Sequence, residues 1–254
     1  MQSIRIATAV RSLLSAHPRL RLFKLVRIVA IVAAVTGGTG VGIAPSGWAA
    51  DVNYSIDDGS AERALGIDPG EDVIWFNTFP VQPGGEVIDS ISASYGRPGL
   101  TGALNGFPIS ILVYEDADGG DPFNAVLKTS VNSTIANANS NTLNVYNLTP
   151  TEVHGTLLAA VLFRNTTAVN KFITPSDETA PSLAGRSFFG FTVDDLNQND
   201  LSSIPAANRG TPEGIGFPGN WLVRAHGVPV PEPALASIAL VGSVLTCAAR
   251  RPTI

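Results

Sequence analysis

Two acidic loops contain the residues whose types and spacing could bind a metal ion. They are Asp116, Asp118 and Asp121 in a Gly-rich turn, and Asp195, Asn197, Asn199 and Asp200 in a later loop. Hard oxygen ligands at alternate positions suit Ca²⁺. Both loops lack the Gly at position six and the Glu at position twelve of the helix-loop-helix calcium pattern. The sequence therefore predicts no cofactor other than weakly bound Ca²⁺, and solvated turns are the simpler interpretation of both loops.

Paired carboxylates raise the question of glycoside hydrolysis, in which two acids face each other about 5 to 10 Å apart across the bond. The chain has four adjacent pairs, namely Asp57-Asp58, Glu71-Asp72, Glu115-Asp116 and Asp194-Asp195. Adjacent residues of a strand point to opposite faces, and most of these pairs border turn residues. A sandwich-fold glycoside hydrolase that uses one of the pairs stays an alternative, but we expect no catalytic residue and no enzyme.

The histidines offer no clearer catalytic centre. His154 and His226 are each isolated and each is followed by a glycine, which indicates turn positions. The sequence contains no His-Glu-x-x-His zinc motif, nucleophile elbow, phosphate loop or dinucleotide fingerprint. The only cysteine, Cys247, lies in an apolar run near the C-terminus. No disulfide and no thiolate metal site is therefore expected in the domain before it.

Aromatic side chains suggest a binding role, because exposed rings can stack on sugars. The candidates between the two ends of the chain are Trp75 and Trp221, together with Tyr54, Tyr95, Tyr114 and Tyr146. Trp75 adjoins Phe76 in a strand-like run, so core packing is favoured for it. Trp221 follows a Pro-Gly-Asn turn, and both an exposed position and a core position are open for it. A carbohydrate-binding module for exopolysaccharide is therefore an alternative function.

Charge is distributed unevenly along the chain. Residues 51–230 contain eight basic and twenty acidic residues, a formal charge of −12, whereas the other eight basic residues lie near the two ends. Such an acidic surface repels phosphate backbones, so nucleic acid is not expected as a partner. With 44% hydrophobic and 15% charged residues, the composition is that of a globular chain rather than a coiled coil or a disordered one.

Short apolar segments separated by Gly, Pro, Asn and Asp indicate an all-β domain with antiparallel sheets, most simply a jelly-roll-like β-sandwich. The expected strands are 52–56, 73–79, 87–95, 107–114, 125–135, 142–148, 156–163, 186–193 and 221–225. Two of them, 109–114 and 155–163, are continuous apolar runs, as is typical of central strands. No stretch between the two ends shows convincing helical periodicity, so one domain over residues 50–228 is expected.

The first 49 residues are expected to be a signal peptide. A long basic segment precedes the apolar run Ile28–Val35, and small residues follow at Gly47, Ala49 and Ala50. This order is typical of a secretory signal, with cleavage after Ala49 slightly favoured over cleavage after Ala50. An uncleaved amphipathic anchor is the alternative for this segment.

The C-terminal segment, residues 229–254, carries the most specific pattern. Pro231, Glu232 and Pro233 precede the uncharged run Ala234–Ala249, which is followed by Arg250 and Arg251. A short apolar helix with basic residues at its cytoplasmic end obeys the positive-inside rule. The order closely resembles the PEP-CTERM sorting signal of Gram-negative bacteria. An ordinary single-span tail anchor is the alternative.

This resemblance implies a route of export. An exosortase-type sorting protease would cut near Pro231-Glu232-Pro233 after the short helix had held the chain transiently in the membrane. Several phrases, such as 54–62, 75–79, 116–125 and 187–191, also resemble ectodomains of PEP-CTERM proteins. The expectation is an exported protein of the cell surface or extracellular matrix, with a non-catalytic structural or binding role and polysaccharide among its candidate partners.

Overall fold

The computed structural model describes residues 50–179, 185–193 and 195–230. The predicted signal peptide, the Pro231-Glu232-Pro233 motif, the apolar run after it and the Arg250-Arg251 pair lie outside the described residues. Within the described ranges, no helix is both long and apolar enough to cross a bilayer.

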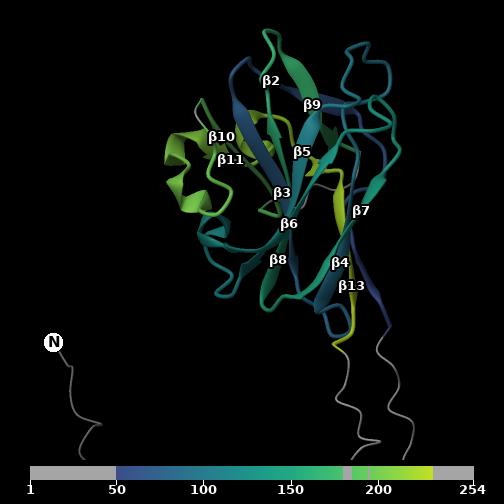
Figure 1. The fold of residues 1–254 in the computed structure, drawn as a ribbon, viewed down its shortest axis with the longest axis vertical. Coiled ribbons are helices and arrows are strands. Elements are labelled where there is room, and N and C mark those ends of the chain that lie inside the picture. Colours follow the sequence, from purple (N-terminus) through teal and green to yellow (C-terminus); the bar gives the residue numbers. More distant parts are fainter. Residues whose placement is uncertain (1–49, 180–184, 194, 231–254) are drawn as a thin grey trace, which may run out of the picture. The chain divides into compact units, whose positions relative to one another are not determined.

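The described residues form three antiparallel sheets, which agrees with the predicted all-β antiparallel class (Figure 1). The orders are β1-β13-β4-β7, β11-β10-β3-β8-β5-β6 and β12-β9-β2. The strands are β1 (Val52–Tyr54), β2 (Arg63–Ile67), β3 (Asp72–Pro80), β4 (Val87–Ala93), β5 (Pro108–Asp116), β6 (Val126–Thr134), β7 (Asn144–Glu152), β8 (Thr156–Arg164), β9 (Lys171–Asp177), β10 (Ser187–Thr192), β11 (Arg209–Gly210), β12 (Asn220–Trp221) and β13 (Val223–Val228).

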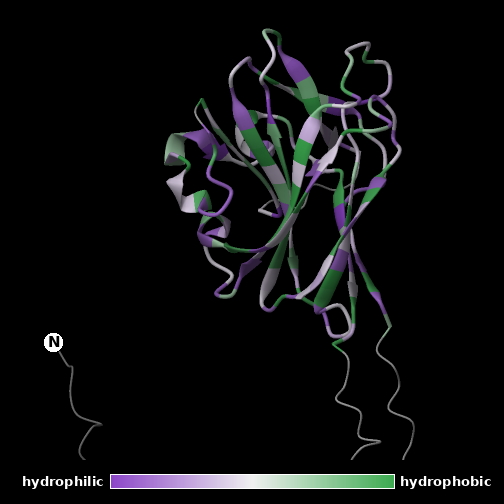
Figure 2. Ribbon diagram, viewed as in Figure 1, coloured by the Kyte–Doolittle hydropathy of each residue, from purple (hydrophilic) through white to green (hydrophobic). Residues whose placement is uncertain are grey.

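The main core lies between the four-stranded and the six-stranded sheet. Figure 2 shows hydrophobic and hydrophilic segments alternating along the strands, as expected where one face of each strand is buried. Trp75 and Val161 from the six-stranded sheet belong to the same buried cluster as Ile91 and Tyr146 from the four-stranded sheet. The two sheets therefore form a sandwich around a common core.

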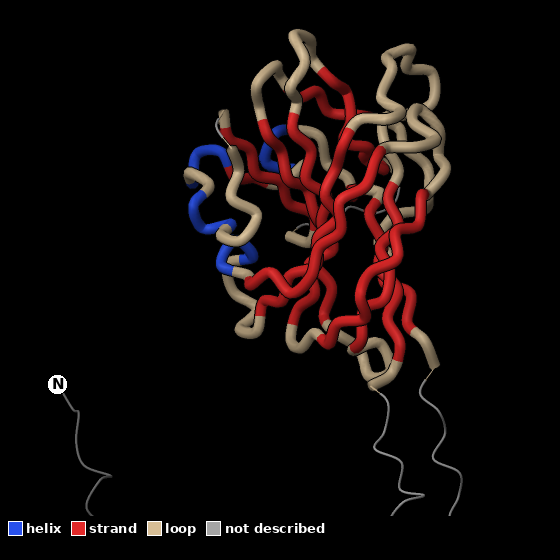
Figure 3. Tube along the Cα trace, viewed as in Figure 1, coloured by secondary structure: helices blue, strands red, loops and turns tan. Residues whose placement is uncertain are grey.

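A second core covers the outer face of the six-stranded sheet. Its cover includes the short 3₁₀ turns η2 (Pro122–Asn124) and η3 (Leu201–Ser203), and Figure 3 shows helical turns on this side of the strands. The next turn, η4 (Ala206–Asn208), contributes no buried residue. Phe123 and Leu201 of these turns share a buried cluster with Phe76, Leu158 and Leu162. Because β8 is thus buried on both faces, its sequence is a continuous apolar run instead of an alternating one.

The three-stranded sheet β12-β9-β2 was not predicted. Strand β2 is five residues long, contains Gly66 and has an irregular register at Leu65/Gly66, so it lacks a strand-like pattern. Strand β9 ends with Pro175, Ser176 and Asp177, residue types that strands disfavour. The expectation of two sheets with about nine strands is therefore incomplete, because burial against neighbouring strands overrides the weak local propensity of these segments.

The first and last described strands lie side by side. Val52 of β1 is opposite Gly227 of β13, and Figure 1 shows both strands ending at the lower end of the domain. The hydroxyl of Tyr54 donates a hydrogen bond to the carbonyl of Gly85 (3.0 Å), which lies in the loop after β3. The chain therefore enters and leaves the domain near the C-terminal end of β3.

Candidate functional site

The first predicted calcium loop does not gather its three acids. The buried carboxylate of Asp116 accepts hydrogen bonds from the backbone N–H groups of Asp118 and Gly119 (3.3 and 3.0 Å). Burial, and then the neighbouring Asp118, raise the pKa of Asp116. Asp121 instead caps η2 by accepting from Phe123 N (3.1 Å) and pairs with Arg209. Only Asp116 and Asp118 therefore stay together as candidate ligands.

The second predicted loop is likewise divided among structural roles. Asp195 forms an ion pair with Arg164 (3.0 Å), while Asn197 accepts a hydrogen bond from the backbone N–H of Asn199 (3.1 Å). Asp200 caps η3 by accepting from Ser202. Across the described part of the chain, no group of three or more His, Cys, Asp or Glu side chains is arranged to hold a metal ion. Weak Ca²⁺ binding stays a prediction for both loops.

The paired carboxylates turn in separate directions, as expected for adjacent strand or turn residues. Asp72 is buried against Arg164 and the N–H of Leu196, whereas Glu71 lines a pocket. Burial raises the pKa of Asp72, and its hydrogen bond from Leu196 opposes that rise. Glu115 accepts a hydrogen bond from the backbone N–H of His154 (2.7 Å). Its neighbour Asp116, the last residue of β5, instead accepts from the loop that follows.

The remaining pairs and the histidines show the same division. Asp57 binds Arg224, and Asp58 accepts hydrogen bonds from Ser60. His154 lies exposed in the turn after β7, where Glu152 is 3.5 Å away. His226 lies in β13, not in a turn as predicted, and its Nδ1 is 2.9 Å from Asp89 Oδ1. The partner Asp194 of the fourth pair lies outside the described residues.

The aromatic candidates for sugar stacking are all buried. Trp75 and Trp221 are 0% exposed. The four tyrosines are also buried, namely Tyr54, Tyr95, Tyr114 and Tyr146. Core packing is therefore confirmed for Trp75, and the open question for Trp221 is decided in favour of an interior position. Among the described large hydrophobic side chains, Phe172 is an exposed aromatic, at 51%.

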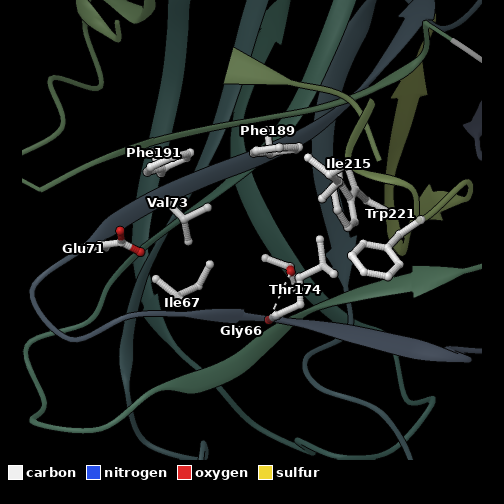
Figure 4. A pocket seen from close by; sticks show the side chains of 11 residues that line it. Gly66, Ile67, Glu71, Val73, Thr174, Phe189, Phe191, Ile215 and Trp221 are labelled. Atoms are coloured by element: carbon white, nitrogen blue, oxygen red, sulfur yellow. Dashed lines mark hydrogen bonds between the residues drawn. The ribbon is translucent and has the colours of Figure 1, made fainter. Parts of the chain in front are cut away.

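A pocket of about 370 Å³ opens between the three-stranded sheet and the edge of the six-stranded sheet (Figure 4). Its walls come from segments far apart in the sequence. One wall consists of Leu65, Gly66 and Ile67 of β2 with Thr174 of β9, and the opposite wall consists of Val73 of β3 with Phe189 and Phe191 of β10. The volume lies at the lower end of the range for small-molecule sites, about 300 to 1,000 Å³.

The end of the pocket is closed by a loop. Trp221 is fully buried, and its indole N–H donates to the carbonyl of Phe188 (2.7 Å), which fixes the ring. Ile215 of the turn η5 (Glu213–Ile215) and Phe217 complete the lining, and Ile215 is 43% exposed. Strand β12 therefore contributes a buried base, and the loop before it contributes a partly exposed rim.

Two polar side chains interrupt the apolar lining. The hydroxyl of Thr174 donates a hydrogen bond to the carbonyl of Leu65 (3.4 Å). Glu71 lies beside Val73 and Phe191 in Figure 4, and its Oε2 accepts a hydrogen bond from the N–H of Asp68 (3.1 Å). An apolar concave site with a few fixed polar groups is the usual form of a small-molecule site.

Within the described ranges, none of the residues of the two predicted calcium loops lines this pocket. Glu71 and Trp221 carried a signal in the sequence, one as half of a carboxylate pair and the other as a candidate aromatic ring. The pocket itself could not be recognised, because two of its strands, β2 and β9, were missed. Its four aromatic residues also come from two segments that no sequence motif connects.

Comparisons with known proteins find no matching family and solved structures of low similarity. No protein-family model matches the chain, and a search of curated proteins finds no significant match. A structure of the clostridial cysteine protease Cwp84 after propeptide cleavage matches at 13% identity and a TM-score of 0.45, covering 71% of this chain and 40% of that one. The cysteine protease and lectin-like domains of Cwp84, a surface-layer-associated protein of Clostridium difficile, match at 13% identity and a TM-score of 0.44, covering 71% and 36%. The chain thus spans less than half the length of either structure.

Proposed function

We propose that this protein is an exported domain that acts at the cell surface by binding a small ligand non-covalently in the pocket between β2, β9, β3 and β10. Its export and sorting would use the signal peptide and the Pro231-Glu232-Pro233 segment. The observation that carries the proposal is the pocket itself, a concave, mainly apolar site with one carboxylate.

The Glu71 end of the pocket lies away from the two described chain ends. Glu71 directly precedes β3, whereas the two described chain ends lie near Gly85, beyond the other end of β3. Nine residues of strand span roughly 26 to 30 Å at about 3.3 Å per residue. The Glu71 end of the pocket and the described chain ends are therefore separated by about the length of β3.

The lining favours an apolar ligand over a sugar. A sugar presents hydroxyl groups that need hydrogen-bond partners, and burying them without partners is unfavourable. The pocket supplies the carboxylate of Glu71 and the already bonded hydroxyl of Thr174. The Trp and Tyr side chains that could form an exposed stacking platform are buried instead. We therefore prefer a ligand with an apolar body to an exopolysaccharide.

Several of the paired carboxylates already bind other groups of the protein, which supports a non-catalytic role. General acid–base hydrolysis of a glycoside needs two carboxyl groups that converge on one bond. Asp57 and Asp72 are each bound to an arginine, and Glu115 accepts a backbone N–H. Glu71 faces the pocket without a second carboxylate in the lining that the structure describes. The proposal therefore assigns binding, and no bond cleavage, to this domain.

A titration with a neutral apolar probe tests this proposal. The full chain, in nanodiscs of phosphatidylglycerol, is titrated with 3,3-dimethylbutan-1-ol and followed by NMR. We expect the indole N–H signal of Trp221 and the amide signal of Gly66 to shift in a saturable way. The amide of Gly155, at the other end of the domain, should stay unchanged.

Two variants at exposed positions provide the control for location. Ile215→Trp places a larger side chain at the mouth and should weaken binding at least about fivefold, whereas Val145→Trp, on β7 and outside the pocket, should leave it within about twofold. Both side chains are exposed, so both variants should fold. Absence of any saturable shift at Trp221 up to about 50 mM probe would contradict the proposal.

A further inference from the structure

The described lining of the pocket carries a negative charge and no positive one. Among the described residues that line it, Glu71 alone is charged. Its Oε2 accepts a hydrogen bond from the backbone N–H of Asp68, and no described residue donates a hydrogen bond to its Oε1. A carboxylate beside an apolar cavity favours a cationic partner, because burying it unpaired against a neutral ligand would cost free energy.

The domain as a whole also carries a net negative charge. Residues 51–230 contain twenty acidic and eight basic residues. Arg63, whose guanidinium lies over the Phe217 ring, forms an ion pair with Glu178, so its charge is already balanced. The net field around the pocket therefore attracts small cations and lowers the local concentration of anions.

Aromatic faces add a second contribution that also favours cations. Phe189, Phe191 and Phe217 line the cavity together with Trp221. The guanidinium of Arg63 already lies 4.3 Å from the centre of the Phe217 ring. Ring faces carry partial negative charge, and aromatic side chains grouped in this way bind ammonium groups.

From this combination we infer that the pocket takes an organic ammonium ion with an apolar body, its charged group beside Glu71 and the ring of Phe191 and its apolar part toward Phe189 and the loop of η5. This inference rests on the proposed function, since it names the ligand class for the same pocket. The ammonium group can belong to a free small molecule or to a lipid headgroup, and the chemistry at Glu71 is the same in both.

Three probes of one shape and different charge test the inference. Choline, 3,3-dimethylbutan-1-ol and 3,3-dimethylbutanoate share one branched shape. The branched end is a positively charged trimethylammonium group in choline and a neutral tert-butyl group in the other two, and the carboxylate has its negative charge at the opposite end. Each is titrated into the full chain in phosphatidylglycerol nanodiscs, with empty nanodiscs as the blank. We expect choline to bind at least about tenfold more tightly than the alcohol, which corresponds to about 1.4 kcal/mol. The carboxylate should give no saturable shift.

Substitutions test which residues cause the preference for choline over the alcohol. Glu71→Gln keeps an oxygen that can accept from Asp68 N, so the turn should persist, and it should reduce choline binding to that of the alcohol. Glu152→Gln changes the net charge equally at a half-exposed side chain at the other end of the domain and should leave the preference unchanged. Phe191→Leu should weaken choline binding by a larger factor than alcohol binding, because only the ammonium group interacts electrostatically with the ring face.

The outcomes separate this inference from the proposed function. If the alcohol shifts Trp221 but choline binds no more tightly, the ammonium inference is wrong and the pocket still binds apolar ligands. If neither probe shifts Trp221, both are wrong. The ammonium inference is also wrong if Glu71→Gln retains the preference for choline. Should that variant fail to fold, the probe series on the unaltered chain decides alone.

A final arm identifies the source of the ammonium group. Phosphatidylcholine vesicles are added to the chain with choline bound. Loss of the choline-dependent shift at Trp221 would assign the group to a lipid headgroup, and an unchanged shift would assign it to a free molecule. Both results support the ammonium site, and they distinguish where the ligand comes from.

Discussion

Arg224 donates hydrogen bonds to both carboxylate oxygens of Asp57, from Nε to Oδ1 and Oδ2 (3.0 and 3.1 Å) and from Nη2 to Oδ1 (2.5 Å). The two residues are 167 positions apart in the sequence, and the Asp57 side chain is fully buried. The pair therefore fastens the loop after β1 to the last strand of the domain.

Removing this arginine should destabilise the domain strongly. Arg224→Ala leaves a buried carboxylate without its partner, and we expect the free energy of unfolding to fall by about 3 to 5 kcal/mol. The control is Lys128→Ala, since the pair between Lys128 and Glu115 is partly exposed and should contribute about 0 to 1 kcal/mol. Urea denaturation measures both, and losses of equal size would contradict the role given to Asp57.

Acid stability should depend on Asp58. Hydrogen bonds from the hydroxyl and the N–H of Ser60, and then from Thr179, lower its pKa to about 2. A carboxylate with a lowered pKa in the folded state stabilises the fold above its unfolded pKa, near 3.9, and this stabilisation is lost as the pH falls toward 2. Asp58→Asn should therefore flatten the decline of the melting temperature between pH 4 and pH 2. An unchanged decline would show that these hydrogen bonds do not persist in solution.

Two glycines with positive φ should respond differently to alanine. Gly155 has φ +68°, and a Cβ there would lie 2.8 Å from the carbonyl of Asp116. Gly70 has φ +80° but nothing within 4 Å of a Cβ. We expect Gly70→Ala to cost about 1 to 2 kcal/mol from backbone strain and Gly155→Ala about 3 to 5 kcal/mol, because it adds a clash. Equal melting temperatures for the two variants would contradict the close approach at Gly155.

Part of this fold was predictable because local pattern and burial agree. The β-branched and aromatic residues of β3 and the apolar run of β8 identify these strands without further information. The second core could not be predicted, because η2 and η3 lie in Gly- and Asn-rich segments whose few apolar residues become buried only against the finished sheet. Local propensity contains no information about such distant contacts.

The pocket illustrates the same limit. Its lining depends on β2 opposite β10, yet neither segment alone carries a binding motif. The acids that the sequence made conspicuous, such as Asp195 and Asp200, serve an ion pair and a helix cap instead. Acidic and amide residues suit turns, caps and metal sites alike, so residue type did not separate these roles.

Sorting through the C-terminal segment predicts a defined mature end. In a host that contains an exosortase, the extracellular form should end near Pro231-Glu232-Pro233 and lack Cys247. Mass spectrometry of that form measures the end directly. Substituting Glu232 by Ala should retain the chain in the membrane fraction, whereas Glu213→Ala, a control in the domain, should not. An extracellular form that still ends at Ile254 would overturn this part of the proposal.

The most direct test of the central claim is a crystal structure of the protein grown with choline at about ten times its dissociation constant. We expect bound choline in the cavity between Phe189, Phe191 and Phe217, with its ammonium group beside Glu71. A cavity that stays empty, or choline bound only elsewhere on the domain, would contradict the claim.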